Sequence, residues 1–252
     1  MTISVSIVSH GQASLVTALH ADLERVCAGP LEIFITLNIP EHRGWEPARG
    51  RFPVTVIANP SPNGYGANHN AAFTRAGGEY FCVLNPDLRL TADPFSALTQ
   101  CASDSRVGVC APLIVNSAGQ PEDSARPFPT PLSIVGKSLG MNSPSPYQAG
   151  TGRQFPDWVA GMFMLFRAAV YRQLGGFDQR YFLYYEDVDL CARLRLAGYQ
   201  VALCTEASAI HDAQRASHRN PHHFLFHLAS MGRFFTSRTF REVMQRRNAA
   251  QP

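Results

Sequence analysis

Three carboxylates crowd together at Glu186, Asp187 and Asp189, directly behind the aromatic pair Tyr184-Tyr185. Carboxylates this close repel one another unless a cation or a helix N-terminus offsets their charge. One of them could act as a general base beside an aromatic wall, where desolvation raises a carboxyl pKa toward the working range. The simpler alternative is that they decorate the start of a helix, with Asp189 paired to Arg193 one turn on.

A second candidate is the turn Asn85-Pro86-Asp87, which follows an apolar segment from Tyr80 to Leu84. In an open α/β sheet, ligands bind at the carboxyl ends of the strands. A carboxylate there can hold Mg²⁺ or Mn²⁺ against a diphosphate, and His211 could be a second metal ligand. The alternatives are an ordinary Asp-Pro turn before a helix near Pro94 and a structural histidine.

Two further segments could contact an oxygen-rich ligand. The segment Asn63 to Asn70 contains two glycines, which allow close backbone approach, and side-chain amides, which could bind sugar or phosphate oxygens. It is neither a P-loop nor a dinucleotide fingerprint, so a plain turn is the alternative. Arg215 and Arg219 lie one turn apart if their segment is helical, and could then bind phosphate.

The elements that must position these residues alternate between strands and helices. Ile3, Val5 and Ile7 alternate with serines and predict a strand that ends near Ser9. Further strands are predicted at 31–37, 54–58 and 80–84, with helices at 15–26 and near 69–76. Short turns between alternating strands and helices predict an α/β fold, Rossmann-like, with an open and mostly parallel sheet flanked by helices.

The second half is less regular. Residues 116–157 are rich in proline, and a loop of that length inside a compact domain is typically functional or mobile. Beyond it, the sequence predicts strands at 158–166 and 200–203 and helices at 168–174 and 186–197. We expect a single domain over 1–220, made of two halves (1–115 and 116–220), and a helical tail over 221–252.

Composition excludes several classes of protein. At 252 residues, 45% hydrophobic and 16% charged, the chain is ordinary globular material, and a net charge of +3 is too small to imply nucleic acid. It has no apolar run of eighteen residues and no signal-peptide pattern, so we expect a cytoplasmic protein. Its six cysteines are scattered without a C-x-x-C pair, which favours small buried hydrophobes over zinc or redox chemistry.

These segments, taken in order, resemble the inverting family-2 glycosyltransferases of GT-A fold, and among them the rhamnosyltransferase-like branch. The resemblance spans nearly the whole chain. The matching stretches are S-I-V-S-H-G (6–11), N-G-Y-G-A-N-H-N (63–70), V-L-N-P-D (83–87), W-V-A-G-M-F-M-L-F-R (158–167), G-G-F-D (175–178), F-L-Y-Y-E-D-V-D-L-C-A-R (182–193) and His211.

The resemblance implies a nucleotide-sugar-binding half (1–115), an acceptor half (116–220) and a role for each matching residue. The family's D-x-D position falls on Asn85-Pro86-Asp87, where only Asp87 supplies a carboxylate, and the E-D motif falls on Glu186-Asp187, with Asp187 the base. Asp87 and His211 would hold Mg²⁺ or Mn²⁺. The second strand lacks the family's acidic residue for the nucleotide base, and Asn38 is the best substitute. The expected donor contacts are Ser9, Asn38, Asn63, Gly64, Asn70, Asn85 and Asp87; the expected acceptor contacts are Trp158, Gly161 and Tyr184; the expected phosphate contacts are Arg215 and Arg219.

The activity implied is transfer of a sugar to a hydroxyl of a glycan or lipid-linked saccharide in cell-surface polysaccharide synthesis. dTDP-rhamnose is the favoured donor, and an apolar wall from Phe163 or Tyr184 would suit its methyl group. A UDP-hexose or UDP-N-acetylhexosamine transferase and an inert nucleotide-sugar-binding module remain alternatives. A nucleotidyltransferase is disfavoured because residues 9–14 contain no Lys or Arg. Aromatic and arginine residues in the tail suggest either peripheral contact with the inner face of the membrane or packing against the core.

Overall fold

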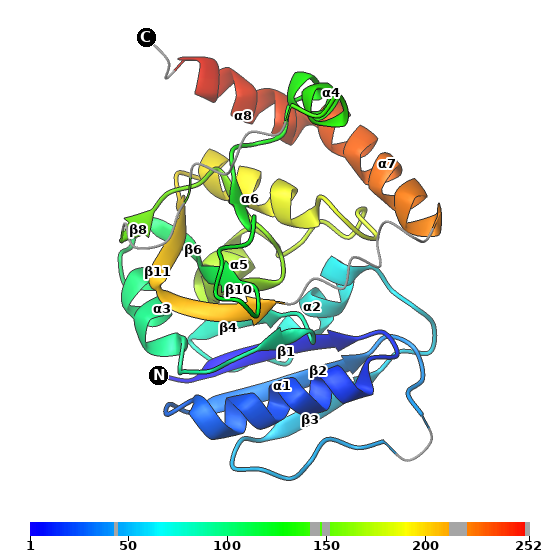
Figure 1. The fold of residues 1–252 in the computed structure, drawn as a ribbon, viewed down its shortest axis with the longest axis vertical. Coiled ribbons are helices and arrows are strands. Elements are labelled where there is room, and N and C mark those ends of the chain that lie inside the picture. The colour runs from blue at the N-terminus through cyan, green and yellow to red at the C-terminus, as the bar shows by residue number, and fades with distance from the viewer. Residues whose placement is uncertain (43–44, 142–146, 148–151, 212–220, 250–252) are drawn as a thin grey trace.

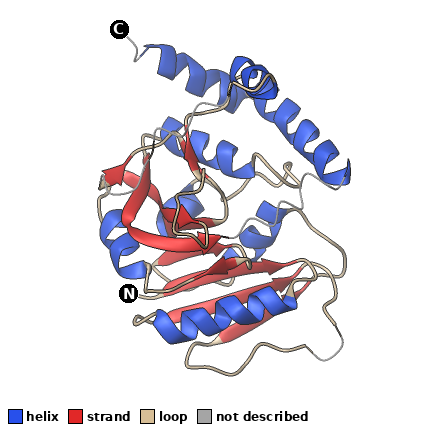
Figure 2. Cartoon of the chain, viewed as in Figure 1, coloured by secondary structure: helices blue, strands red, loops and turns tan. Residues whose placement is uncertain are grey.

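A computed structural model describes residues 1–42, 45–141, 147, 152–211 and 221–249. Its centre is a sheet with the strand order β3-β2-β1-β4-β10-β6-β11-β5, flanked by helices (Figures 1 and 2). The strands are β1 (Ile3–Ser9), β2 (Leu31–Leu37), β3 (Val54–Ala58), β4 (Tyr80–Leu84), β5 (Leu88–Arg89), β6 (Val107–Val115), β7 (Ala125–Arg126), β8 (Arg153–Gln154), β9 (Trp158–Val159), β10 (Phe163–Arg167) and β11 (Gln200–His211). The helices are α1 (Ala13–Val26), α2 (Tyr65–Phe73), α3 (Phe95–Ala102), α4 (Pro131–Ser138), α5 (Ala168–Gln173), α6 (Glu186–Leu196), α7 (Pro221–Thr236) and α8 (Arg238–Ala249).

The N-terminal half of the sheet is parallel, as predicted. Strands β3, β2, β1 and β4 pair in that order, and Ser9 at the end of β1 lies opposite Leu37 at the end of β2. Every residue of β1 is buried, including Ser4 and Ser6, because both faces of a parallel sheet are covered. The carboxyl ends of these strands therefore meet at one edge, where the predicted donor contacts follow them.

The second half of the sheet is mixed. Strand β10 runs antiparallel between β4 and β6, and β11 is parallel to β6. The short strand β5 pairs antiparallel with the end of β11. These pairings bring the segments before β10 and at the end of β11 against the turn that follows β4.

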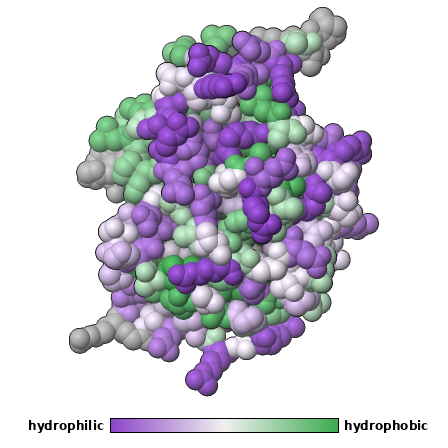
Figure 3. Space-filling view, turned by 180° about the vertical axis from the view of Figure 1, so that it is seen from behind, coloured by the Kyte–Doolittle hydropathy of each residue, from purple (hydrophilic) through white to green (hydrophobic). Residues whose placement is uncertain are grey.

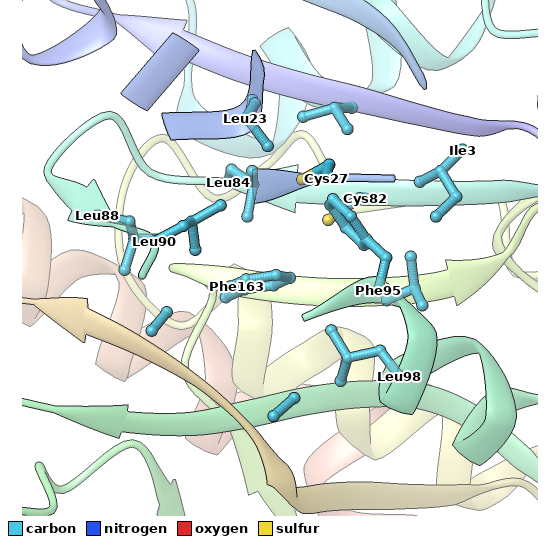
Figure 4. Packing of buried hydrophobic residues seen from close by; sticks show 14 of the residues in the cluster. Ile3, Leu23, Cys27, Cys82, Leu84, Leu88, Leu90, Phe95, Leu98 and Phe163 are labelled. Carbon is cyan, nitrogen blue, oxygen red and sulfur yellow. The ribbon is translucent and has the colours of Figure 1, made fainter. Parts of the chain in front are cut away.

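Hydrophobic cores form on both faces of the sheet. Along β4, Cys82 and Leu84 pack in the core shared with α1 and α3, whereas Phe81 and Val83 pack in the core shared with α5 and α6. Figure 4 shows the first core, where Cys82 lies beside other apolar side chains. All six cysteines are free and buried, which confirms their predicted role as small buried residues.

Several boundaries differ from the prediction. Helix α2 begins at Tyr65 rather than near residue 69, because the extended backbone of Gly64 caps it. The segment 158–166 is two strands, interrupted at 160–162, and the strand predicted at 200–203 continues to His211 as the partner of β6 and β5. Strand β6 was not predicted at all, and the proline-rich segment contains the helix α4 and short strands.

The tail is helical, as predicted, and part of it belongs to the core. Phe234 of α7 and Val243 of α8 are buried, and α8 packs against α6. In Figure 1 these helices and α4 lie at the end of the molecule farthest from β3. Among the helices described, none has the length and apolar character needed to cross a membrane. The division into a domain and a separate tail stays a prediction.

Candidate active site

Asp87 and His211, the predicted metal ligands, are adjacent. Asp87 belongs to the turn at the end of β4, where Asn85 N–H donates to Met162 O at 2.8 Å. The pairing of β5 with β11 sets His211 opposite Leu88, one residue beyond Asp87. His211 Nε2 consequently lies 3.2 Å from Asp87 Oδ2.

The ligand atoms that Asp87 and His211 offer here suit a divalent cation. Asp87 Oδ1 is buried and, within the described residues, has no hydrogen-bond partner. A buried carboxylate oxygen without a donor is costly unless an ion or water satisfies it. A carboxylate oxygen and an imidazole nitrogen suit Mn²⁺, and Mg²⁺ less well, once diphosphate oxygens complete the coordination.

Asp187 has a fixed orientation at the start of α6. Its Oδ2 accepts the Gly161 N–H at 2.8 Å, and its Oδ1 accepts the Val188 N–H at 2.8 Å. Burial raises the pKa of Asp187 above its ordinary value, and these hydrogen bonds oppose the rise. Glu186 is more deeply placed: its burial, with the charge of Asp187, raises its pKa well above the ordinary value. Asp187 is therefore the better oriented of the two as a base.

The third carboxylate has a structural partner. Asp189 is buried and its Oδ2 lies 2.7 Å from Arg193 Nε, the pairing that the helical spacing predicted. Arg193 also donates to the carbonyl oxygens of Leu174 and Gly176, at 2.9 and 2.8 Å. Arg193, paired with Asp189, thus connects α6 to the G-G-F-D turn.

Two consecutive tyrosines carry strained backbone just before these carboxylates. Tyr184 and Tyr185 have φ of 70° and 65°, in the left-handed region that non-glycine residues rarely adopt. Helix α7 holds both: the Tyr184 hydroxyl lies 3.0 Å from His223 Nδ1, and the Tyr185 ring packs on Phe234. Such strain persists only where its surroundings impose it, and here it sets how α6 begins.

Tyr65 connects the two carboxylate regions. Its hydroxyl lies 2.8 Å from Asn85 Oδ1 and 2.8 Å from Gly161 O. Burial raises the pKa of Tyr65 well above the ordinary value, and nearby carboxylates, including Asp187 and Asp87, raise it further. The phenol is therefore neutral and lies between the metal-ligand candidates and the candidate base. The amino-acid sequence alone did not indicate a role for Tyr65.

Asn38 and Asn63, two residues predicted to contact the sugar donor, are hydrogen-bonded to each other. Asn38 is buried; its Oδ1 accepts from Asn63 N–H at 2.8 Å and Asn59 Nδ2 at 2.9 Å, while its Nδ2 donates to Asn63 O at 3.0 Å. Gly64 comes next, and a Cβ there would lie 2.8 Å from Phe182 O. Asn38 thus holds the loop that contains Asn63. Because Gly64 has no side chain, this loop can contact the segment before α6. Contacts of Asn38, Asn63 and Gly64 with the sugar donor stay predictions.

Ser9 lies beside an acidic residue. Its hydroxyl donates to Glu41, whose carboxylate also accepts the N–H groups of Gln12 and Ala13, at 3.1 and 3.2 Å, at the start of α1. Glu41, four residues after Leu37, thus lies at the N-terminus of α1, where the helix dipole favours a carboxylate.

Asn70 faces away from this edge into the scaffold. Its Oδ1 accepts from the Tyr171 hydroxyl at 2.7 Å and from Phe177 N–H at 3.0 Å, and its Nδ2 donates to Phe177 O at 2.8 Å. These bonds occupy most of its capacity and fix the G-G-F-D turn. A donor contact by Asn70 stays a prediction.

On the predicted acceptor side, Trp158 donates from Nε1 to Pro127 O at 3.0 Å, and the Arg126 guanidinium lies 5.4 Å from its ring. Arg126 also lowers the pKa of Asp187, a role that its distant sequence position did not indicate. Phe163 or Tyr184 was expected beside the sugar methyl. For Phe163 that expectation was wrong, because its side chain is 1% exposed and packs in the core shared with α1 and α3 (Figure 4). Arg215 and Arg219 lie outside the described residues.

The fold is the GT-A fold of glycosyltransferases. A crystal structure of GalNAc-T7 with UDP, GalNAc and Mn²⁺ matches 83% of this chain with a TM-score of 0.63 at 16% identity, and the match covers 43% of that chain. At such identity the likeness shows the fold alone.

The chain belongs to glycosyl transferase family 2, whose model matches residues 4–174. It is 33% identical over 162 residues to rhamnosyltransferase WbbL of Escherichia coli, across 60% of this chain and 61% of that protein. It is 27% identical over 230 residues to the N-acetylglucosaminyl-diphospho-decaprenol L-rhamnosyltransferase of Mycobacterium tuberculosis, across 80% of this chain and 73% of that protein. The first match spans less than two thirds of its relative.

Proposed function

We propose that this chain is an inverting glycosyltransferase that moves rhamnose from dTDP-rhamnose to a hydroxyl of a glycan or lipid-linked saccharide in cell-surface polysaccharide synthesis. The observation that carries the proposal is the hydrogen-bonded path from Asp187 through Gly161 and Tyr65 to Asn85. It joins an oriented carboxylate with a raised pKa to the turn that bears Asp87. An acceptor-activating base and a diphosphate-binding turn are what a single displacement needs.

The residues divide the reaction between them. The acceptor hydroxyl attacks the anomeric carbon from the face opposite the diphosphate, and Asp187 takes its proton. A divalent cation held by Asp87 and His211 would offset the charge that builds on the leaving diphosphate. Asn63 and Gly64 would bring backbone against the donor, and Arg215 and Arg219 would contact its phosphates.

The acceptor would enter from the side of Trp158 and Tyr184. The relative from Mycobacterium tuberculosis is named for a diphospho-decaprenol acceptor, which supports a lipid-linked saccharide here. Gly161 has no side chain between Tyr65 and Asp187, where a Cβ would lie 3.4 Å from the Asp187 Cβ. Glycine at this position therefore leaves the space beside the Asp187 carboxylate free of a side chain of residue 161.

The donor assignment rests on the two rhamnosyltransferase relatives and is tested by competition. We expect dTDP with Mn²⁺ to raise the melting temperature more than UDP or GDP at equal concentration, because specific binding stabilises the folded state. Mass spectrometry of products from dTDP-rhamnose, with and without acceptor, separates transfer from mere binding. A clear preference for UDP would replace the rhamnosyl donor with a UDP-hexose or UDP-N-acetylhexosamine, and binding without any transfer would indicate the inert module.

A membrane role for the C-terminal region is part of this proposal. In α7, Phe224, Leu225 and Leu228 are 62%, 61% and 40% exposed, and in α4 Leu132 is 81% exposed. Figure 3 shows apolar surface at the end of the molecule that carries these helices. Exposed apolar residues on α7, together with the arginines of α7 and α8, suit an anionic membrane surface, where a lipid-linked acceptor is found.

A further inference from the structure

Three cysteines far apart in the sequence converge in the core. Cys101 comes from α3, Cys110 from β6 and Cys204 from β11, and their Sγ atoms all lie within 4.8 Å of one another. They are buried, with exposed fractions of 2%, 0% and 2%. The spacing in the chain shows no metal motif, so only the fold reveals this group.

The sheet register explains the convergence. Strands β6 and β11 are parallel neighbours, with Cys110 opposite Ala202 and Cys204 opposite Pro112. Cys110 and Cys204 therefore point to the same face of the sheet, two positions apart. Helix α3 packs across both strands on that face and adds Cys101.

The two strand cysteines are poorly placed for a disulfide. Adjacent strands lie about 4.8 Å apart, and two positions along a strand add about 6.6 Å, which puts their Cα atoms about 8 Å apart. A disulfide needs Cα atoms closer than about 7 Å. All three thiols are free in the structure.

The spacing of the sulfur atoms suits a shared cation. Zinc binds thiolate sulfur at about 2.3 Å, so three sulfurs around one ion lie about 3.8–4.0 Å apart. Small side-chain rotations that move the Sγ atoms by about 1 Å would bring the three sulfurs to that separation. No other Cys, His, Asp or Glu ligand atom in the described part of the chain joins the group, which leaves a fourth position open.

The surroundings favour a negative charge on one thiol of the group. Hydrogen bonds from the Cys110 and Cys204 thiols lower the pKa of Cys101. The pKa values of Cys110 and Cys204 are themselves raised, by their hydrogen bonds with Cys101 and by burial. Arg153 of β8 lies opposite Cys204 in the antiparallel strand pairing, and its guanidinium is 3.5 Å from the Asp104 carboxylate, so the effects of these two charges on Cys101 oppose each other. One thiolate held by two thiols is an arrangement that a metal ion can enter by displacing two protons.

We propose that Cys101, Cys110 and Cys204 form a binding site for a thiophilic divalent cation with a filled d shell, such as Zn²⁺. Three thiolates and a divalent ion carry one net negative charge; a monovalent ion would leave two in a buried site, at greater cost. The bound ion would tie α3 to β6 and β11. Strand β11 also carries His211, so the site stabilises the framework of the proposed active site from the opposite end of that strand.

The test is a titration of the full, reduced, metal-free chain with Cd²⁺, followed by the ultraviolet thiolate-to-cadmium charge-transfer band. We expect the band to saturate at one equivalent and a large excess of Zn²⁺ to displace Cd²⁺ with loss of the band. Proton release into a weak buffer should accompany binding, and Zn²⁺ should raise the melting temperature. Oxygen and imidazole ligands give no such band, so Asp87 and His211 do not contribute to the ultraviolet signal, which is the deciding measurement.

Matched variants decide whether these thiols are responsible. Cys110→Ala should abolish the band or weaken Cd²⁺ binding at least tenfold, whereas Cys27→Ala, which also removes a buried thiol (1% exposed), should leave binding unchanged. Cys204→Ser serves if Cys110→Ala does not fold. Absence of a band in the wild-type chain, or equal binding in the Cys110 and Cys27 variants, would overturn the proposal.

Discussion

The backbone N–H of Gly161 donates a 2.8 Å hydrogen bond to Asp187 Oδ2, so the segment before β10 orients the candidate base. The Gly161 carbonyl on the same residue accepts from the Tyr65 hydroxyl. Tyr65, from the segment predicted to contact the sugar donor, therefore holds Gly161, and Gly161 in turn orients the carboxylate of Asp187.

Asp187→Asn should lower turnover by about 10²–10⁴-fold, because an amide cannot take the acceptor proton. Donor affinity should stay near wild type, since Asp187 accepts hydrogen bonds from Gly161 and Val188 and is not among the predicted donor contacts. In the wild type, kcat/KM should rise with pH through a pKa above the ordinary aspartate value, because the base must lose its proton. Steady-state kinetics over pH check both points. Near-normal turnover in Asp187→Asn would transfer the role to Glu186.

Glu186→Gln should stabilise the protein above about pH 5, where an ordinary glutamate is ionised. Burial raises the folded pKa of Glu186, so its protonated form is favoured in the folded state. Stability is then highest below the unfolded pKa and falls as pH rises toward the folded pKa. Glutamine stays neutral throughout, so we expect melting temperatures equal to wild type near pH 4 and higher by about 2–4 °C at pH 8. The exposed Glu242→Gln is the control, and a similar gain there would refute the explanation.

Asp87→Ala or His211→Ala should each weaken Mn²⁺-dependent binding of the nucleoside diphosphate by about 10–100-fold, because each removes a ligand or an orienting contact. EDTA should remove wild-type turnover, and added Mn²⁺ should restore it. Calorimetric titration with and without Mn²⁺ measures the effect, and Glu79→Ala, at an exposed pair with the N-terminus, is the control. Full activity in EDTA would end the metal role and leave Arg215 and Arg219 as the diphosphate clamp.

Tyr65→Phe should reduce kcat by about tenfold or more with a smaller change in KM, because a 1 Å displacement of reacting groups is costly. The ring keeps its packing against His69 and Phe177, but Asn85 Oδ1 and Gly161 O lose their donor. Loss of a buried hydrogen bond also costs about 1–3 kcal/mol of stability. The pH profile of kcat separates the two effects, because only a positioning role shifts the apparent pKa of Asp187. An unchanged profile and kcat would remove Tyr65 from the site.

Local sequence patterns predicted which segments carry the site residues, but not which of these residues contact one another. Asn85-Pro86-Asp87 follows an apolar strand, and Glu186-Asp187 opens a helix, so residue type and spacing identified both. The sequence did not indicate a role for Tyr65, because its partners Asn85 and Gly161 are 20 and 96 positions away. The pairing of β10 with β4 brings these two partners together.

The same reason applies to strand boundaries and to the cysteines. An apolar run predicts a strand but not its partner, so the continuation of β11 to His211 depended on β5 and β6. The grouping of Cys101, Cys110 and Cys204 depends on which strands are neighbours in the sheet. Tertiary pairing supplied what local periodicity lacks.

Replacing Phe224 and Leu225 of α7 together with glutamine should weaken binding to anionic vesicles, because it removes the most exposed apolar side chains of that helix. Substitution is preferable to deletion of residues 237–252, since Val243 of α8 is buried and its loss would disturb the core. Both replaced side chains are largely exposed, so the variant should fold and transfer sugar to a water-soluble acceptor at the wild-type rate.

Co-sedimentation with vesicles of phosphatidylglycerol and phosphatidylcholine measures this binding. We expect wild-type binding to fall as salt rises, because arginines of α7 and α8 such as Arg233 and Arg241 contribute electrostatic attraction to anionic lipid. Val56→Gln is the matched control, since Val56 is 41% exposed on β3, at the other end of the molecule (Figure 1). Binding that ignores salt, or that is equal in the α7 and β3 variants, would show that the exposed face of α7 does not contact the membrane.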